Sequence, residues 1–189
     1  MKKIGVIGLL LFSLLAHGND FDRIAEILGN IDTPRNETIP FVEKRQNQLL
    51  EEPLILHGEV LFAADGTLSK RIERPVQERV TISADSLELA RNGRVRRVSL
   101  DKRAGVKVFY AGMRALLDGD TRSLFELFVV SASVGDAENW TIELVPKDAD
   151  LRTFVEQMII SGQGGQVITV HTDQPGGDWQ EMSFRPASD

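Results

Sequence analysis

The sequence predicts an α+β fold, in which one curved antiparallel sheet carries two or three helices across one face. Apolar side chains recur at every second residue from Leu54 to Leu100, which is the spacing of β-strands. Between Val106 and Leu117 they recur at every third and fourth residue, which is the spacing of an α-helix. The period of two returns at Trp140. Strands on both sides of a helical segment therefore define the fold class.

The chain begins with the three-part layout of a cleavable secretory signal peptide, residues 1–18. Lys2 and Lys3 form a basic start, and residues 4–15 form an almost unbroken apolar run. That run is shorter than the roughly 20 residues that a membrane-spanning helix needs. We therefore expect export from the cytoplasm. No repeat, low-complexity tract or Pro/Gly-rich linker divides the remainder, so residues 19–189 are expected to form a single domain.

Local patterns predict the first elements of the mature chain. Residues 21–28 predict a short amphipathic helix, whereas the pattern of residues 41–45 leaves their element type open. The dipeptides Asp-Gly at 65–66 and Asn-Gly at 92–93 are hairpin-turn signals between strands of the first run. Gly58 lies within a predicted strand, where it indicates a bulge or the close approach of another segment.

The second half of the chain is predicted to contain two helices followed by further strands. The helix that ends at Leu117 is followed by a second apolar helical segment that includes residues 124–128. Strands are then expected from Trp140, through the segment 154–160, and on both sides of the glycine-rich turn at 162–165.

Composition excludes several classes of function. Removal of residues 1–18 leaves 20 basic and 28 acidic side chains, a net charge of −8, so we expect no binding of nucleic acid. The chain has no cysteine, and its two mature histidines, His57 and His171, have no partners at metal-ligand spacing. No serine stands in a G-x-S-x-G motif. We therefore expect neither an enzyme nor a metal or other cofactor, and a monomer in solution.

One basic cluster interrupts this acidic chain around the Asn-Gly turn. Its members are Arg91, Arg94, Arg96, Arg97, Lys102 and Arg103. One interpretation is a solvated sheet edge that discourages pairing with other sheets. The other is a docking patch for an acidic partner or for lipid headgroups. Residue spacing leaves both open.

Five blocks of sequence, in a fixed order, resemble a known family. They are PLILHGEVLF at 53–62, the segment 68–75, MRALLDGD at 113–120, NWTIELVP at 139–146, and Gly-Asp at 177–178. Over residues 41–184 the chain resembles the LolA-type periplasmic outer-membrane lipoprotein carriers. It is more similar to a divergent LolA-related group that is found beside polyene-pigment and fatty-acyl biosynthesis genes.

The resemblance implies a half-open β-barrel with helices covering the concave face and a hydrophobic cavity for acyl chains. It implies a periplasmic carrier that takes an acylated lipoprotein or lipid cargo from an inner-membrane transporter to an outer-membrane acceptor. The family's latch arginine corresponds to a position near residues 63–65, where this sequence has none. Arg71 and Arg74 are the alternatives for that role.

The expected acyl-cavity lining consists of apolar side chains on the predicted strands and helices. They are Leu54, Leu56, Val60, Phe62, Leu68, Ile72, Val80, Ile82, Val106, Phe109, Met113, Leu116, Leu117, Trp140, Ile142, Leu144, Phe154, Met158 and Ile160. Periodicity alone does not separate such a cavity from an ordinary core. Two other functions also stay open: a lipid- or lipoprotein-sensing interaction module, and an auxiliary enzyme of acyl or polyene biosynthesis.

Overall fold

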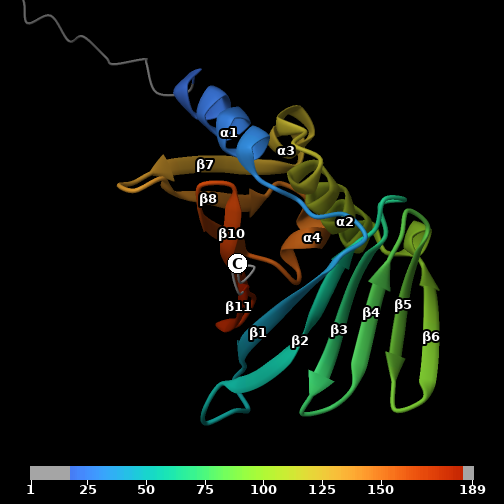
Figure 1. The fold of residues 1–189 in the computed structure, drawn as a ribbon. Coiled ribbons are helices and arrows are strands. Elements are labelled where there is room, and N and C mark those ends of the chain that lie inside the picture. The colour runs from blue at the N-terminus through green and yellow to red at the C-terminus, as the bar shows by residue number, and fades with distance from the viewer. Residues whose placement is uncertain (1–17, 185–189) are drawn as a thin grey trace, which may run out of the picture.

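A computed structural model describes residues 18–184, which form eleven strands and four α-helices (Figure 1). The strands are β1 (Thr38–Gln46), β2 (Leu54–Phe62), β3 (Leu68–Arg74), β4 (Glu78–Ile82), β5 (Ser86–Arg91), β6 (Arg94–Ser99), β7 (Phe128–Val134), β8 (Asn139–Pro146), β9 (Gln157–Gln163), β10 (Gln166–Gln174) and β11 (Asp178–Phe184). The helices are α1 (Gly18–Asn30), α2 (Ala104–Leu117), α3 (Thr121–Leu127) and α4 (Ala149–Arg152), with a 3₁₀ turn η1 (Leu100–Lys102) before α2. The predicted α+β class is confirmed.

All eleven strands belong to one antiparallel sheet, in the order β6-β5-β4-β3-β2-β1-β11-β10-β9-β8-β7. The sheet is curved and does not close, so that β6 and β7 are its two edges (Figure 1). Strands β1 and β11 pair at its centre, with Phe41 opposite Phe184. The eleven strands thus form two meanders, β1–β6 and β7–β11, that this central pairing joins.

The helices form a layer over one half of the sheet. Helices α1 and α3 pack on β7, α4 packs on β8, and α2 packs on α3 and α4. Beneath this layer lies the main core, in which Ile24, Leu124, Phe128, Ile142 and Leu144 are fully buried. Because its apolar residues come from both the helices and the strands, this half has the two-layer packing of an ordinary domain.

The other half of the sheet has a much smaller core. Phe41, Leu56 and Ile72 are its buried members. Among the described residues, no helix packs extensively against β2–β6. We call β2–β6 the open half. Its apolar side chains are therefore not covered in the way that those of β7–β9 are.

Gly58 shows the close approach that the sequence indicated. The pairing register of β2 and β3 shifts between His57 and Gly58, which marks a bulge. A Cβ on Gly58 would lie 2.0 Å from the carbonyl oxygen of Arg71. Only glycine leaves room for β3 to pass this closely.

The structure differs from the sequence-based expectations at several elements. Residues 41–45, whose type was open, belong to strand β1. The second apolar helix ends at Leu127, and Phe128 begins strand β7, which the sequence analysis did not predict. Phe154 lies in the connection between α4 and β9 rather than in a strand.

The expected signal peptide lies almost wholly in residues 1–17, which are outside the described residues. Across residues 18–184, none of the helices has the length and apolar character that crossing a bilayer requires.

Candidate functional site: the inner face of the open half

The pairing register shows which face of the open half lies on the same side of the sheet as the main core and the helices. Residues directly opposite in neighbouring strands share a face. Ile142 of β8 faces the main core, and the register carries this face across the sheet to Met182 of β11, Glu43 of β1 and Leu56 of β2. We call it the inner face.

Side chains on the inner face of the open half form three rows that run across the strands. The helix-end row is Phe62, Leu68, Ile82, Leu87 and Val98. The middle row is Val60, Lys70, Val80, Leu89 and Arg96. The far row is Gly58, Ile72, Glu78, Arg91 and Arg94. The face therefore changes from wholly apolar to mainly charged with distance from the helices.

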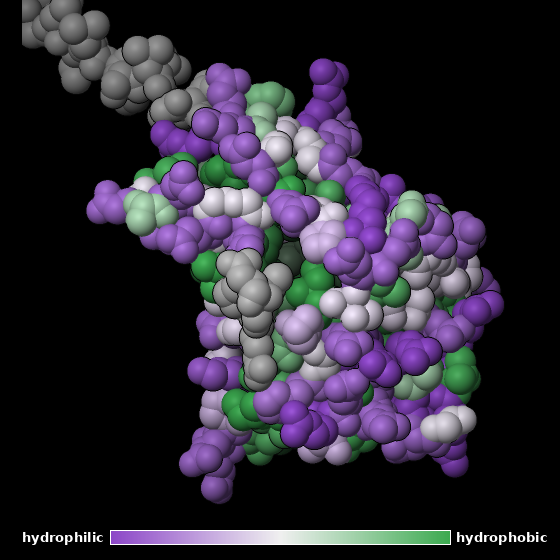
Figure 2. Space-filling view, viewed as in Figure 1, coloured by the Kyte–Doolittle hydropathy of each residue, from purple (hydrophilic) through white to green (hydrophobic). Residues whose placement is uncertain are grey.

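The apolar side chains of this face are incompletely covered. Leu68, Ile82, Leu87 and Val98 of the helix-end row are half-buried, and Leu89 is 36% exposed. In Figure 2, apolar side chains are visible in a recess between β10 and the helix layer, whereas the surface over β3–β6 in this view is mostly hydrophilic. A protein leaves a group of adjacent apolar side chains open to solvent chiefly where something binds.

A buried charge cluster marks the boundary between the two halves. Glu43 is fully buried, and its Oε1 accepts hydrogen bonds from Arg45 Nε at 3.0 Å and Nη2 at 2.7 Å. Its other oxygen contacts the ammonium group of Lys70, which also lies 5.2 Å from the centre of the Phe41 ring. Burial lowers the pKa of Lys70 from its ordinary value of 10.5, although Glu43 acts to raise it. The carboxylate of Glu43 is thus the counter-ion of two cationic side chains.

Helix α2 touches the open half at the turn between β2 and β3. The hydroxyl of Tyr110 donates a hydrogen bond to the carbonyl oxygen of Gly66 at 3.1 Å. A Cβ on Gly66, whose φ is +87°, would lie 1.4 Å from an Arg114 nitrogen. This turn therefore needs glycine both for its backbone conformation and for the close approach of the arginine.

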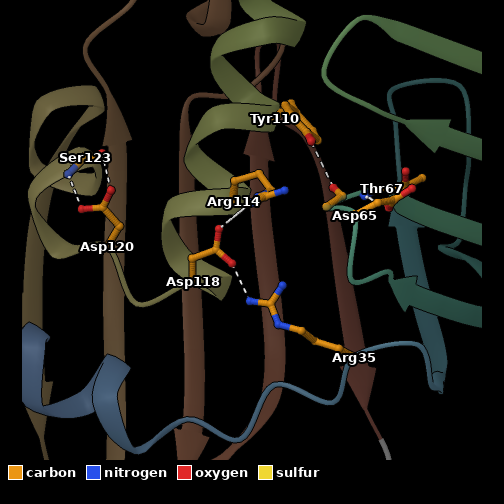
Figure 3. Close-up of polar contacts among 9 residues, drawn as sticks. Arg35, Asp65, Thr67, Tyr110, Arg114, Asp118, Asp120 and Ser123 are labelled. Carbon is orange, nitrogen blue, oxygen red and sulfur yellow. Dashed lines mark hydrogen bonds and ion pairs between the residues drawn. The ribbon is translucent and has the colours of Figure 1, made fainter.

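Asp118 joins the end of α2 to the segment that follows α1 (Figure 3). It accepts hydrogen bonds from Arg35 at 2.5 Å and from Arg114 Nε at 3.0 Å. Although burial acts to raise it, the hydrogen bonds from the two arginines hold the pKa of Asp118 below its ordinary value of 3.8. Arg35 also lies over the Phe62 ring, 4.4 Å from its centre. We call these contacts, together with the Tyr110–Gly66 bond, the rim contact.

Arg71, one alternative for the latch, lies elsewhere. It pairs with Glu59 at 2.8 Å and with Glu73 at 2.9 Å, on the face opposite Lys70 and Ile72. Arg114 of α2 lies against Gly66 in the β2–β3 turn, and both Arg114 and Arg35 pair with Asp118 and lie over the Phe62 ring at the end of β2. Sequence reasoning missed both, because neither stands near the position at which the family's arginine falls.

The structure distributes the nineteen predicted lining residues over three places. The eight from Leu54 to Ile82 lie on the inner face of the open half. The five from Val106 to Leu117 lie on α2 and are half-buried. The remaining six, from Trp140 to Ile160, pack in the main core, with all but Phe154 buried. Leu87, Leu89 and Val98 complete the open inner face and were not among the predicted lining residues.

The polar groups that were weighed as chemical candidates form structural contacts. His171 lies 3.2 Å from Asp173 and stacks on Trp179. Ser99 and Lys102 have the S-x-x-K spacing, but the Ser99 hydroxyl caps η1 by accepting from the Asp101 amide. Within residues 18–184, no group of three or more possible metal ligands comes together. The arrangement offers a surface for burying an apolar ligand.

A single curved sheet with helices over one half of its inner face defines a half-open β-barrel. Residues 16–188 match the family described as outer membrane lipoprotein carrier protein LolA-like. The chain belongs to this family.

Solved structures with a similar arrangement share little sequence with this chain. A LolA superfamily protein from Nitrosomonas europaea is 10% identical, with a TM-score of 0.44 over 88% of this chain and 92% of that one. A putative outer membrane lipoprotein-sorting protein domain from Vibrio parahaemolyticus is 11% identical, with a TM-score of 0.46 over 89% and 91%. The lipoprotein LppX from Mycobacterium tuberculosis is 11% identical, with a TM-score of 0.41 over 89% and 95%. No curated protein sequence matches the chain.

Proposed function

We propose that the protein is a periplasmic carrier that shields the acyl chains of a lipoprotein or another lipidated product between the inner and outer membranes. The observation that carries this proposal is the wholly apolar helix-end row on a half of the sheet that no helix layer covers. Family membership supports it. Export through the signal peptide, an inner-membrane donor and an outer-membrane acceptor are parts of the same proposal.

The energetics suit a ligand that has to be both bound and released. Burying an acyl chain contributes about 0.8 kcal/mol per CH₂, so covering eight methylenes contributes roughly 6 kcal/mol before any cost. The helix-end row is already half-buried, which reduces the area that a ligand newly covers. A site that stays open on one side therefore holds its cargo with moderate affinity.

A matched pair of variants on β4 tests the proposal. Val80 and Thr81 are adjacent and both half-buried, but Val80 lies on the inner face and Thr81 on the opposite one. Delipidated mature protein is titrated with a fluorescent long-chain fatty acid. We expect Val80→Lys to weaken binding about tenfold or more, because a charge enters the apolar surface. Thr81→Lys is expected to bind like the unmodified chain.

Native mass spectrometry of protein purified from periplasm provides an independent test. We expect a bound acyl mass that disappears in Val80→Lys and persists in Thr81→Lys. Fatty-acid binding that responds equally to both variants contradicts the proposed site. A stable complex with a membrane protein, in place of transfer of the ligand to acceptor vesicles, favours the sensing function instead.

A further inference from the structure

The basic cluster around the β5–β6 turn is divided by the sheet into two faces. Arg91, Arg94 and Arg96 lie on the inner face, in the middle and far rows. Arg97 lies on the opposite face, where its Nη2 is 2.7 Å from Glu88. Arg91 and Arg94 stand at the end of the open half that is farthest from the helices, and Arg96 lies one row closer to them. They border the apolar surface on which the proposed function rests.

An open hollow of about 810 Å³ lies at this end of the sheet. Leu89, Arg91, Asn92, Arg94, Val95 and Arg96 line it. A second hollow of the same volume shares Arg91, Asn92 and Val95, but it continues along the ends of β3 and β4 onto the opposite face, where Arg71 and Glu73 line it. Volumes of roughly 300–1,000 Å³ are typical of small-ligand sites. Leucine and arginine side chains therefore meet in a space that can admit a ligand.

The inner-face cations differ in how far they are already neutralised. Arg45 and Lys70 share the carboxylate of Glu43, and Arg91 lies 3.7 Å from Glu78. Within the described part of the chain, Arg94 and Arg96 have no carboxylate within 4.0 Å. They are the two inner-face guanidinium groups that remain to bind an external anion.

The charge of this face is opposite to that of the chain. The inner face of β1–β6 carries five cationic side chains, Arg45, Lys70, Arg91, Arg94 and Arg96, and two carboxylates, Glu43 and Glu78, for a net charge of +3. The chain as a whole carries −6. A concave surface of one sign concentrates ligands of the other sign.

We propose that the open half binds a lipid with an anionic headgroup, a phosphate or a carboxylate, in a defined direction. The alkyl chain lies on the helix-end row and on Val80 and Leu89 of the middle row, and the headgroup lies at Arg94 and Arg96. Four residues separate Leu68 from Ile72, so the two outer rows are roughly 13 Å apart along a strand. Guanidinium groups pair with phosphate and carboxylate through two parallel hydrogen bonds. This orientation of the lipid rests on the proposed function, because it requires the apolar side chains to bind the alkyl chain.

Three probes separate the contributions of the head and the tail. Delipidated mature protein is titrated by calorimetry with dodecyl phosphate and with dodecyl maltoside, each below its micellar concentration, and with inorganic phosphate. We expect dodecyl phosphate to bind about tenfold or more tightly than the uncharged maltoside, the effect of hydrogen bonds to a charged group. Inorganic phosphate alone is expected to bind far more weakly than either. The preference for phosphate over maltoside is expected to fall as salt is raised.

Exposed arginines on opposite faces of β6 provide matched variants that leave the core unchanged. Arg94→Gln and Arg96→Gln, made singly so that each removes one charge as Arg97→Gln does, are each expected to weaken the preference for dodecyl phosphate while the affinity for the maltoside is unchanged. Arg97→Gln is expected to keep the preference. If Arg97→Gln loses it equally, the effect belongs to overall charge and the proposed headgroup site is wrong.

The remaining outcomes separate this proposal from the proposed function. Equal binding of the phosphate and maltoside probes overturns the headgroup site and leaves the acyl-binding function standing. No binding of either dodecyl probe overturns the acyl-binding function itself. Inorganic phosphate that binds as tightly as dodecyl phosphate and displaces it shows a free-anion site, which overturns the lipid assignment.

Discussion

Lys70 of β3 and Glu43 of β1 form an ion pair that reaches across the strand between them, β2. Both side chains lie on the inner face, where Glu43 is fully buried between the main core and the open half. Arg45 provides the second cation. The contact thus links three adjacent strands at the point where the helix layer ends.

Replacing the carboxylate is expected to destabilise the fold strongly. Glu43→Gln leaves the largely buried Lys70 and the partly exposed Arg45 without their counter-charge, and we expect a loss of about 2–3 kcal/mol in the free energy of unfolding. Urea denaturation measures it. Glu59→Gln, which removes the exposed pair with Arg71, is the control and is expected to cost less than about 1 kcal/mol. Similar losses in the two variants contradict a special role for Glu43.

The same substitution is expected to lower the pKa of Lys70 further. Burial already lowers it, and the charge and hydrogen bond of Glu43 are what oppose this effect. Since the folded-state pKa lies below the unfolded one, the unfolded chain binds the extra proton between them. Stability therefore rises with pH from the folded-state pKa up to about 10.5. In Glu43→Gln the rise in stability is expected to begin at lower pH. Nitrogen NMR of the lysine side chain measures the folded-state pKa of Lys70 in both proteins.

The rim contact is expected to give the protein an acid-sensitive component of stability. The folded-state pKa of Asp118 is lowered, so its contribution is complete above the ordinary value of 3.8 and is lost as pH falls through the lower folded-state value. Asp118→Asn is expected to remove that part of the pH dependence. Tyr110→Phe, which removes the hydrogen bond to Gly66, is expected to keep it. Urea midpoints of the unmodified chain and the two variants are measured from about pH 2 to 6, a range that brackets the ordinary pKa of a carboxyl group.

Two glycines are expected to be irreplaceable by alanine. A Cβ on Gly162 would lie 2.1 Å from the Trp140 ring, and one on Gly58 would lie 2.0 Å from the Arg71 carbonyl oxygen. We expect each Gly→Ala change to cost about 1–3 kcal/mol, the usual cost of overpacking. Gly29→Ala is the control, because nothing lies within 4 Å of its added Cβ. Thermal denaturation that places all three variants at the same midpoint contradicts this account.

Local signals were enough for most of the fold. The Asp-Gly and Asn-Gly turns, the strand glycine Gly58 and the helical period after Val106 each act over a few residues, and the structure confirms them. Strand β7 was missed because it follows α3 directly, without glycine or proline. The mainly apolar run from Leu124 to Val130, which only Glu126 interrupts, is compatible with either a helix or a strand.

The polar parts of the site depend on contacts between distant segments. From the sequence alone, a glutamate in a strand such as Glu43 is expected to be a solvated charge. Its partner Lys70 is 27 residues away. Arg35 and Asp118 are 83 residues apart. For the basic cluster, strand alternation separates Arg96 from Arg97 but does not say which of them faces inward. The order of strands across the whole sheet supplies that information.

The central pairing of β1 with β11 has a consequence for how the protein reaches its folded state. Segments near opposite ends of the polypeptide, Thr38–Gln46 and Asp178–Phe184, are neighbours in the finished sheet. A nascent chain that has not yet produced β11 lacks the strand that joins the two meanders, and such distant pairings form slowly. Completion of the barrel wall therefore requires β11, and the chain before β11 holds two meanders that nothing yet joins.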